Sequence, residues 1–194
     1  ITAEAQPTVV TEIPDRSSYL FKAGQFVFFT SGDSLLRTNG TQSGTVFLRN
    51  GFTDGFSSLT EFNSMLVFIS GDELWRSDGT PGGTTLLITR NELEILAGIG
   101  STLLFSGTDA ATGQELYRTN GTSSGTALVS DINPGPGDGF RGHSAVVGEN
   151  LFFRGNNGVN GDEPWKSNGT AAGTLMIEDI NPGPANGFVS GHFD

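Results

Sequence analysis

Short apolar runs alternate with polar, glycine-containing turns along the whole chain. Runs of three or four apolar residues occupy positions 26–29, 66–69, 103–105 and 151–153. This length is typical of a strand that is buried on both faces. Each run is followed by a second segment that ends in Asn-Gly or Asp-Gly, the strongest short-range signal for a hairpin turn. The pattern predicts many short strands joined by tight turns.

One ten-residue motif occurs four times without gaps. Its copies read GDSLLRTNGT, GDELWRSDGT, GQELYRTNGT and GDEPWKSNGT, and they begin at Gly32, Gly71, Gly113 and Gly161. Each copy is followed after two residues by Gly-Thr and then by a third apolar segment, at residues 45–48, 84–88, 126–129 and 174–177. A fourth strand is expected after the linkers at 54–56, 138–140 and 186–188. The starts are 39, 42 and 48 residues apart, so the chain is a repeat array.

Four antiparallel strands in a unit of this length predict one propeller blade. The expected fold is therefore all-β, a β-propeller-like array of four-stranded antiparallel blades. We expect one array over residues 1–194, with units at about 17–53, 54–91, 92–138 and 139–186. Half-units flank them, because Thr8–Ile13 matches a third strand and Phe188–His192 starts another fourth strand. The half-units predict a piece of a longer array, or pairing with each other or with a second copy of the chain.

Composition narrows the class of protein and its partners. The 29 Gly keep no period of three and accompany 15 Phe, which excludes collagen and disfavours helical bundles. The chain has no Cys, which excludes disulfides and thiolate metal sites. A net charge of -11 opposes binding to nucleic acid and to anionic membranes. No apolar run reaches the roughly 18 residues that a membrane-spanning helix needs, so we expect no membrane insertion.

The second copy of the motif, Glu73–Thr80 with Gly83-Thr84, resembles the ELWxxDGT repeat, also called hyalin-like, of secreted and surface proteins of bacteria. The segments Asp131–Gly135 and Asp179–Gly183 match the end of that repeat. The resemblance implies a propeller-like, secreted or cell-surface repeat module, and it implies no reaction. The first and fourth copies depart from the family pattern, with Leu36 at the aromatic position and Pro164 at the leucine position.

Three aromatic residues share one position of the repeat: Trp75, Tyr117 and Trp165. As ligand-binding residues they would stack on sugar rings at several linked sites. As structural residues they would be wedges between neighbouring blades, and Leu36 at the same position favours this interpretation, because leucine packs well and stacks poorly. Next to them stands a basic residue, Arg37, Arg76, Arg118 or Lys166, for which we expect an ion pair with an acid at the start of the motif (Asp33, Asp72, Asp162).

Acidic, glycine-rich loops make Ca²⁺ the one cofactor to consider. Ca²⁺ takes six to eight oxygen ligands, and the candidates are Asp131, Asp138 and Asp179. No segment matches an EF-hand loop or the calcium-binding nonapeptide repeat, and Asp in a turn also caps the local backbone without a metal. We therefore assign no metal ligand and expect no cofactor, with Ca²⁺ as the alternative.

Catalytic motifs are missing from the sequence. The two histidines, His143 and His192, stand at related places in successive units, which fits the repeat better than a general base. We therefore expect no enzyme, no catalytic residue, and a non-enzymatic extracellular module for binding or adhesion to a protein or a surface glycan. The alternatives are a multivalent carbohydrate-binding lectin and an extracellular glycoside-active enzyme, and a homo-oligomer joined through the terminal half-units is a further expectation.

Overall fold

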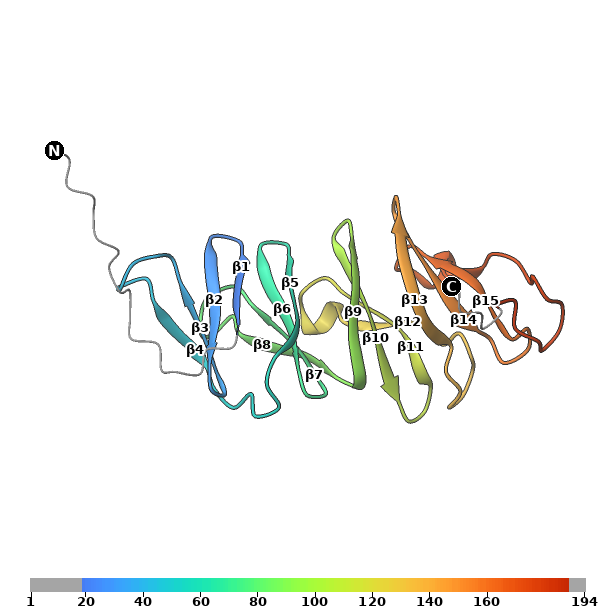
Figure 1. Cartoon of the computed structure of the whole chain (residues 1–194), viewed down its shortest axis with the longest axis horizontal. Coiled ribbons are helices and arrows are strands. Elements are labelled where there is room, and N and C mark those ends of the chain that lie inside the picture. The colour runs from blue at the N-terminus through green and yellow to red at the C-terminus, as the bar shows by residue number, and fades with distance from the viewer. Residues whose placement is uncertain (1–18, 189–194) are drawn as a thin grey trace, which may run out of the picture. The chain divides into compact units, whose positions relative to one another are not determined.

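The computed structural model describes residues 19–188, which form β-strands and two single-turn 3-10 helices. The strands make four antiparallel sheets of four strands each, and every sheet uses consecutive strands (Figure 1). The all-β prediction is therefore confirmed. The chain divides into two compact units, residues 1–71 with 75–85 and residues 72–74 with 86–194. Thr8–Ile13 and residues 189–192 of the predicted half-units lie outside the described residues.

The first two sheets come from the first half of the chain. The first sheet contains β1 (Leu20–Ala23), β2 (Phe26–Ser31), β3 (Ser34–Thr38) and β4 (Val46–Arg49). The second sheet contains β5 (Ser57–Phe62), β6 (Met65–Ser70), β7 (Glu73–Ser77) and β8 (Thr85–Thr89). The apolar run at 66–69 is buried throughout, as its length predicts.

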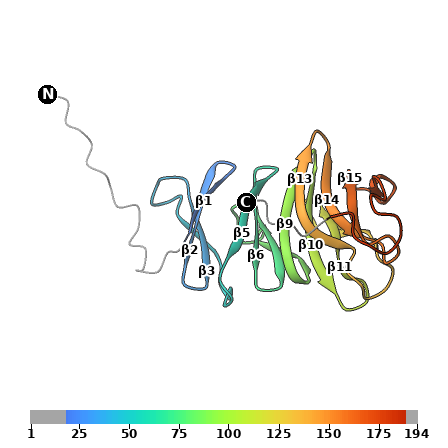
Figure 2. The same cartoon turned by 45° about the vertical axis from the view of Figure 1, so that its right-hand side comes forward.

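The other two sheets follow the same order. The third contains β9 (Asn91–Ile99), β10 (Thr102–Asp109), β11 (Gly113–Thr119) and β12 (Ala127–Ser130). The fourth contains β13 (Phe140–Val147), β14 (Asn150–Asn156), β15 (Asp162–Ser167) and β16 (Leu175–Met176). The 3-10 turns η1 (Ser123–Gly125) and η2 (Ala171–Gly173) precede β12 and β16. Figure 2 shows strands of the third sheet beside β13 and β14 of the fourth.

The turn after each motif explains why the motif is conserved between the four copies. In the first copy Asn39 Oδ1 accepts hydrogen bonds from the Thr41 amide (3.1 Å) and hydroxyl (2.7 Å), and Thr41 Oγ1 accepts from the Gly44 amide (2.9 Å). Gly40 has φ +92°, and a Cβ on Gly44 would lie 1.7 Å from Asn39 Oδ1. The Asn/Asp-Gly-Thr-x-x-Gly sequence is thus one hydrogen-bonded turn that only this spacing allows.

Within each unit, a hydrophobic core joins two neighbouring sheets. In the first unit the buried residues come from the first sheet, the β4–β5 loop and the second sheet: Ala23, Phe28, Leu35, Leu48, Phe52, Phe56, Leu66, Phe68 and Trp75. In the second unit they come from the third and fourth sheets and the loop between them: Leu104, Leu116, Val129, Ile132, Phe140, Leu151 and Phe153. Each core is formed by facing surfaces of two sheets, which is how a blade buries its apolar side chains.

The basic residue of the motif does not form the predicted ion pair. Arg37 Nε donates to the carbonyl of Gly79 in the second sheet's turn (2.9 Å), and Arg118 donates to the carbonyl of Gly169 in the fourth (3.3 Å). Among the described residues no ion pair joins Arg37 to Asp33, Arg76 to Asp72 or Lys166 to Asp162, and Asp162 pairs with Arg154 and Arg141 instead. The reason is that the side chain points from one sheet to the turn of the next, so the carbonyl is within reach and the acid is not.

Candidate functional site

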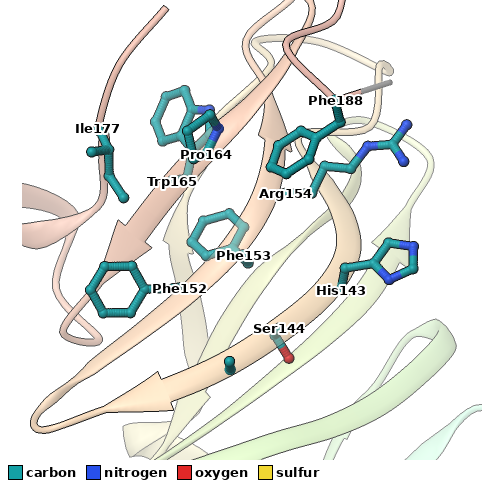
Figure 3. Close-up of a pocket in the computed structure, with 10 residues that line it drawn as sticks. His143, Ser144, Phe152, Phe153, Arg154, Pro164, Trp165, Ile177 and Phe188 are labelled. Atoms are coloured by element: carbon teal, nitrogen blue, oxygen red, sulfur yellow. The ribbon is translucent and has the colours of Figure 1, made fainter. Parts of the chain in front are cut away.

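An open groove of about 430 Å³ lies on the outer face of the fourth sheet, away from the core shared with the third. Figure 3 shows its apolar walls around Phe152, Pro164, Ile177 and Phe188. Strand register explains the arrangement, because Phe152 pairs with Lys166 and Arg154 pairs with Pro164, so these side chains share a face. Phe153 and Trp165 pair with each other on the opposite face of the sheet, and they form the floor of the groove.

Polar side chains border the groove on one side. Arg154 lies beside the Phe188 ring, with 5.9 Å between the guanidinium carbon and the ring centroid (Figure 3). The same guanidinium forms an ion pair with the buried carboxylate of Asp162, which also accepts a hydrogen bond from Asn156 Nδ2 (2.7 Å). His143 stands exposed at the bulge in β13 with φ +50°. The groove therefore combines apolar walls with one fixed cation.

Burial by itself raises the pKa of the Asp162 carboxyl. Hydrogen bonds from Asn156 and Arg154, and the positive charges of Arg154 and Arg141, outweigh burial, so the pKa ends below its usual value of 3.8. Asp162 is therefore ionised at neutral pH, and its charge holds the Arg154 guanidinium at the groove.

The structure places the three predicted ligand-binding aromatics in the sheet cores or beneath the groove. Trp75 is 6% exposed, packs edge-on against Phe52 at 5.3 Å between centroids, and carries the Arg49 guanidinium on its face. Tyr117 is 2% exposed and stacks on Phe105 at 5.5 Å. Trp165 is half-buried, packs on the second core and contributes to the floor of the groove. Of the three, only Trp165 borders an open site, and ligand binding by any of them stays a prediction.

Two buried glutamates occupy equivalent places in the third and fourth repeats, and the sequence did not single them out. Glu115 Oε1 accepts from the Asn133 amide (3.2 Å), and Glu163 Oε2 accepts from the Ile180 amide (3.0 Å). Both side chains are fully buried, and a Cβ on Gly139 or Gly187 would lie 2.2 Å from the respective carboxylate. Each glutamate thus anchors the loop that follows the last strand of its sheet, β12 or β16. Its signal in the sequence is the pairing of the motif Glu with a later Asp-Ile-Asn-Pro-Gly segment.

Glu115 has a strongly perturbed pKa. Burial raises the pKa of its carboxyl from 4.5 to about 7, against the hydrogen bonds from the Asn133, Ile132 and Gly139 amides, which favour the charged form. The charge of Asp131 adds to the rise. One oxygen of each carboxyl, Glu115 Oε2 and Asp131 Oδ1, is buried without a hydrogen-bond partner among the described residues.

The weak calcium candidates fall into two kinds. Asp138 is engaged by protein groups, since Oδ1 accepts from the Gln114 amide (3.0 Å) and Oδ2 from Arg141 (2.9 Å). Asp131 and Asp179 each keep one buried oxygen without a partner, although Asp179 Oδ2 accepts from Asn160 (2.7 Å). Within residues 19–188 no three His, Cys, Asp or Glu side chains are placed to hold one metal ion. The expectation of no cofactor stays a prediction, with calcium binding as its alternative.

Comparisons with known proteins reach the fold and no further. No protein-family model and no curated protein matches the sequence. Puromycin hydrolase matches with a TM-score of 0.50 at 14% identity, over 87% of this chain and 30% of that chain. A mutant of puromycin hydrolase complexed with PGG matches with the same TM-score and identity, over 84% of this chain and 29% of that chain. The designed Ika4 protein matches with a TM-score of 0.47 at 12% identity, over 84% of this chain and 98% of that chain.

The chain therefore spans about 30% of the length of the puromycin hydrolase that it matches. At such identity the likeness concerns the fold alone, and the structural neighbours include β-propeller-like proteins.

The prediction that the chain is not an enzyme is wrong on this comparison, because the matched structures include a hydrolase. The prediction depended on missing motifs, such as a nucleophile elbow or a metal-binding helix. Their absence excludes particular mechanisms and leaves other enzymes open, since unrelated functions share one fold. The likeness assigns no catalytic residue to this chain.

Proposed function

We propose that the chain is a β-propeller-type array of blades that acts as an extracellular binding module. Each described sheet is a meander of four antiparallel strands, and sheets share cores face to face, which supports the blade interpretation. The propeller-like neighbours support it as well. The resemblance of the motif to the ELWxxDGT repeat supports a secreted or cell-surface location. Between residues 19 and 188 no helix is long and apolar enough to cross a membrane.

The groove on the fourth sheet is the observation that carries the proposal. Apolar side chains that would normally be covered stand open there, with Ile177 46% and Phe188 40% exposed. Exposed apolar surface of this kind, bordered by a fixed cation, is typical of a place where a partner binds. The aromatics of the repeat motif are mostly buried, so this groove offers more area to a ligand than Trp75 or Tyr117 does.

The test compares two exposed apolar positions. Ile177→Asp places a charge in the groove, and Val159→Asp, at a residue 66% exposed and outside the groove lining, is the matched control. Both labelled variants and the wild type are applied to a glycan array and to a panel of immobilised extracellular proteins. Binding that falls for Ile177→Asp and persists for Val159→Asp supports the groove. Equal binding by both variants, or no binding by the wild type, contradicts it; glycan signal alone selects the lectin form of the proposal.

A second candidate function is hydrolysis by the chain itself. The fold likeness to puromycin hydrolase, over 30% of that chain, supports it. The chain is incubated with puromycin and with peptide and glycoside chromogenic substrates, and product is followed by chromatography. Turnover that tracks the folded protein through a thermal melt supports this candidate, and its absence contradicts it for the 194-residue chain.

A further inference from the structure

The outer face of the fourth sheet repeats the surface that elsewhere in the chain receives another sheet. Phe28 and Leu104 pair across their sheets with the basic residues Arg37 and Arg118, and Phe152 pairs with Lys166 in the same way. Phe28 and Leu104 are 1% and 0% exposed because the second and the fourth sheet cover them. Phe152 thus occupies a position that is part of a sheet-on-sheet interface in two other sheets.

The neighbouring positions follow the same rule. Two residues before the basic residue stand Leu35 and Leu116, both fully buried, and in the fourth sheet Pro164, which is half-buried. Four residues after the Gly-Thr glycine stand Leu48 and Val129, at 3% and 6% exposure. The fourth sheet has Ile177 there, at 46%.

The linker phenylalanine shows the same difference. Phe56 and Phe140 are 6% and 1% exposed, and each packs on a phenylalanine of the following sheet, Phe68 or Phe153, at 5.4 Å between ring centroids. Phe188 is the equivalent residue after the fourth sheet and is 40% exposed. The groove therefore corresponds to the surface that, in the other sheets, packs against apolar side chains of the following sheet.

A polar contact accompanies the apolar one at these two covered faces, whereas Arg76 of the second sheet donates to Thr85 Oγ1 within its own sheet. Arg37 donates to the Gly79 carbonyl and Arg118 to the Gly169 carbonyl, both in the Asn/Asp-Gly turn of the sheet that docks. Lys166 stands at this position in the fourth sheet, and no hydrogen bond or ion pair of its ammonium group occurs within the described residues. The face thus offers a donor for the carbonyl of one more Asn/Asp-Gly turn.

The first sheet has exposed side chains on the face that corresponds to a docking surface. A Cβ on Gly79 or Gly169 would lie 2.5 Å or 3.2 Å from side chains of the preceding sheet, whereas no residue of the described part of the chain lies within 4 Å of a Cβ on Gly40. On the same sheet Phe47 pairs with Leu36, the residue at the motif's aromatic position, and Phe47 is 52% exposed. Leu20, which pairs with Phe29 in the same row, is 72% exposed, while Phe29 itself is 3% exposed, so the exposed apolar surface lies at the edges of the row.

We propose that the groove of the fourth sheet binds the first sheet of a second copy of this chain. In this contact Lys166 Nζ donates to the Gly40 carbonyl of the other copy, and Phe152, Ile177 and Phe188 cover its Leu36 and Phe47. The two surfaces differ, so the contact is head-to-tail rather than two-fold symmetric. The inference names the partner of the groove in the binding module proposed above and rests on that proposal.

The net charge of -11 on each copy opposes this association at long range. Added salt screens that repulsion, with a Debye length of about 8 Å at physiological ionic strength. Lys166 binds a neutral carbonyl in the proposed contact, so salt weakens it little. Association is therefore expected to strengthen as salt rises, unlike an interface held by ion pairs.

The test uses two variants that each damage one surface. Phe47→Asp alters the first sheet and Ile177→Asp alters the groove, both at side chains already exposed, and Val159→Asp is the control. Sedimentation velocity over a wide concentration range is expected to show association for the wild type and for Val159→Asp. Each of the other variants alone should raise the dissociation constant at least about tenfold, because a carboxylate would be buried without a partner.

Mixing the two damaged variants is the decisive step. Ile177→Asp keeps an intact first sheet and Phe47→Asp keeps an intact groove, so the mixture should form a heterodimer with wild-type affinity and no larger species. A monomeric wild type, association that survives either variant, or a mixture that stays monomeric overturns the proposal. A monomeric wild type whose array binding is still lost in Ile177→Asp overturns only the second copy as partner and leaves the binding module standing.

Discussion

Replacing Glu115 with Gln should change how the stability of the chain depends on pH. The side chain is fully buried, Oε1 accepts from the Asn133 amide, and Oε2 has no hydrogen-bond partner among the described residues. Glutamine keeps an acceptor at Oε1 and has the neutral charge of the protonated acid. Glu115→Gln therefore removes the titration while preserving the anchor of the loop at 131–139.

The size of the effect follows from the pKa. Burial raises the pKa of Glu115 from 4.5 to about 7, and each pKa unit corresponds to about 1.36 kcal/mol, which gives about 3 kcal/mol. Because the folded-state pKa lies above the unfolded one, the folded protein binds the proton more tightly. The stability contributed by protonation is complete below about pH 4.5 and is lost as the pH rises through about 7.

Urea denaturation of the wild type and Glu115→Gln at a series of pH values from 4 to 8.5 measures this. The free energy of unfolding of the wild type, relative to the variant, should fall by about 3 kcal/mol across that range. Asp162→Asn gives the opposite sign in a separate series below pH 4, because the lowered pKa of Asp162 makes its contribution complete above its usual value of 3.8 and lost as the pH falls further. If the free energy of unfolding of the wild type, relative to Glu115→Gln, does not change with pH or rises with pH, the assignment of a raised pKa to Glu115 is refuted.

The remaining predictions concern packing and the repeat turn. Gly155→Ala would place a Cβ 2.7 Å from Trp165 Cδ1 and should lower the free energy of unfolding by about 1–3 kcal/mol. At Gly82 no atom of the described residues lies within 4 Å of a Cβ, so Gly82→Ala should leave the free energy of unfolding within about 0.5 kcal/mol of the wild type. Thermal denaturation of both variants checks the contrast. Asp78→Ala removes the acceptor of two turn hydrogen bonds of 2.9 and 2.7 Å. Chemical denaturation should show a free energy of unfolding that is lower by about 1–2 kcal/mol. Asp78→Asn should be nearly neutral, because Asn occupies this position of the turn in the other three repeats. Equal losses in the two Asp78 variants would contradict the hydrogen-bond explanation.

Strands and turns could be predicted from the sequence because both are local. The apolar runs at 66–69 and 103–105 became β6 and β10, and the Asn-Gly and Asp-Gly pairs became turns with positive φ at Gly40 and Gly79. These features depend on a few neighbouring residues, and four copies in register reinforce the signal. The third strand of the last repeat, expected at 174–177, is shorter in the structure, where β16 is Leu175–Met176.

Contacts between sheets could not be predicted from the repeat pattern, because they join residues that are far apart in the sequence. The pairing predicted for Arg37 with Asp33 failed because the guanidinium meets a carbonyl 42 positions away, at Gly79. Glu115 does not stand out as one residue of a repeat, because its raised pKa comes from burial beneath the loop at 131–139 and, to a smaller extent, from the charge of Asp131. The groove was missed for the same reason, since Phe152 and Ile177 match residues that are buried in other repeats and differ only in lacking a covering sheet.

Hydroxyl-radical footprinting at low and high protein concentration tests most directly whether the fourth-sheet groove is a binding face for another blade. The account predicts that Phe47, Ile177 and Phe188 are oxidised in dilute protein and protected in concentrated protein, while Val159 is oxidised equally in both. Oxidation of the three residues that does not change with concentration, or protection that appears on Val159 instead, would contradict it.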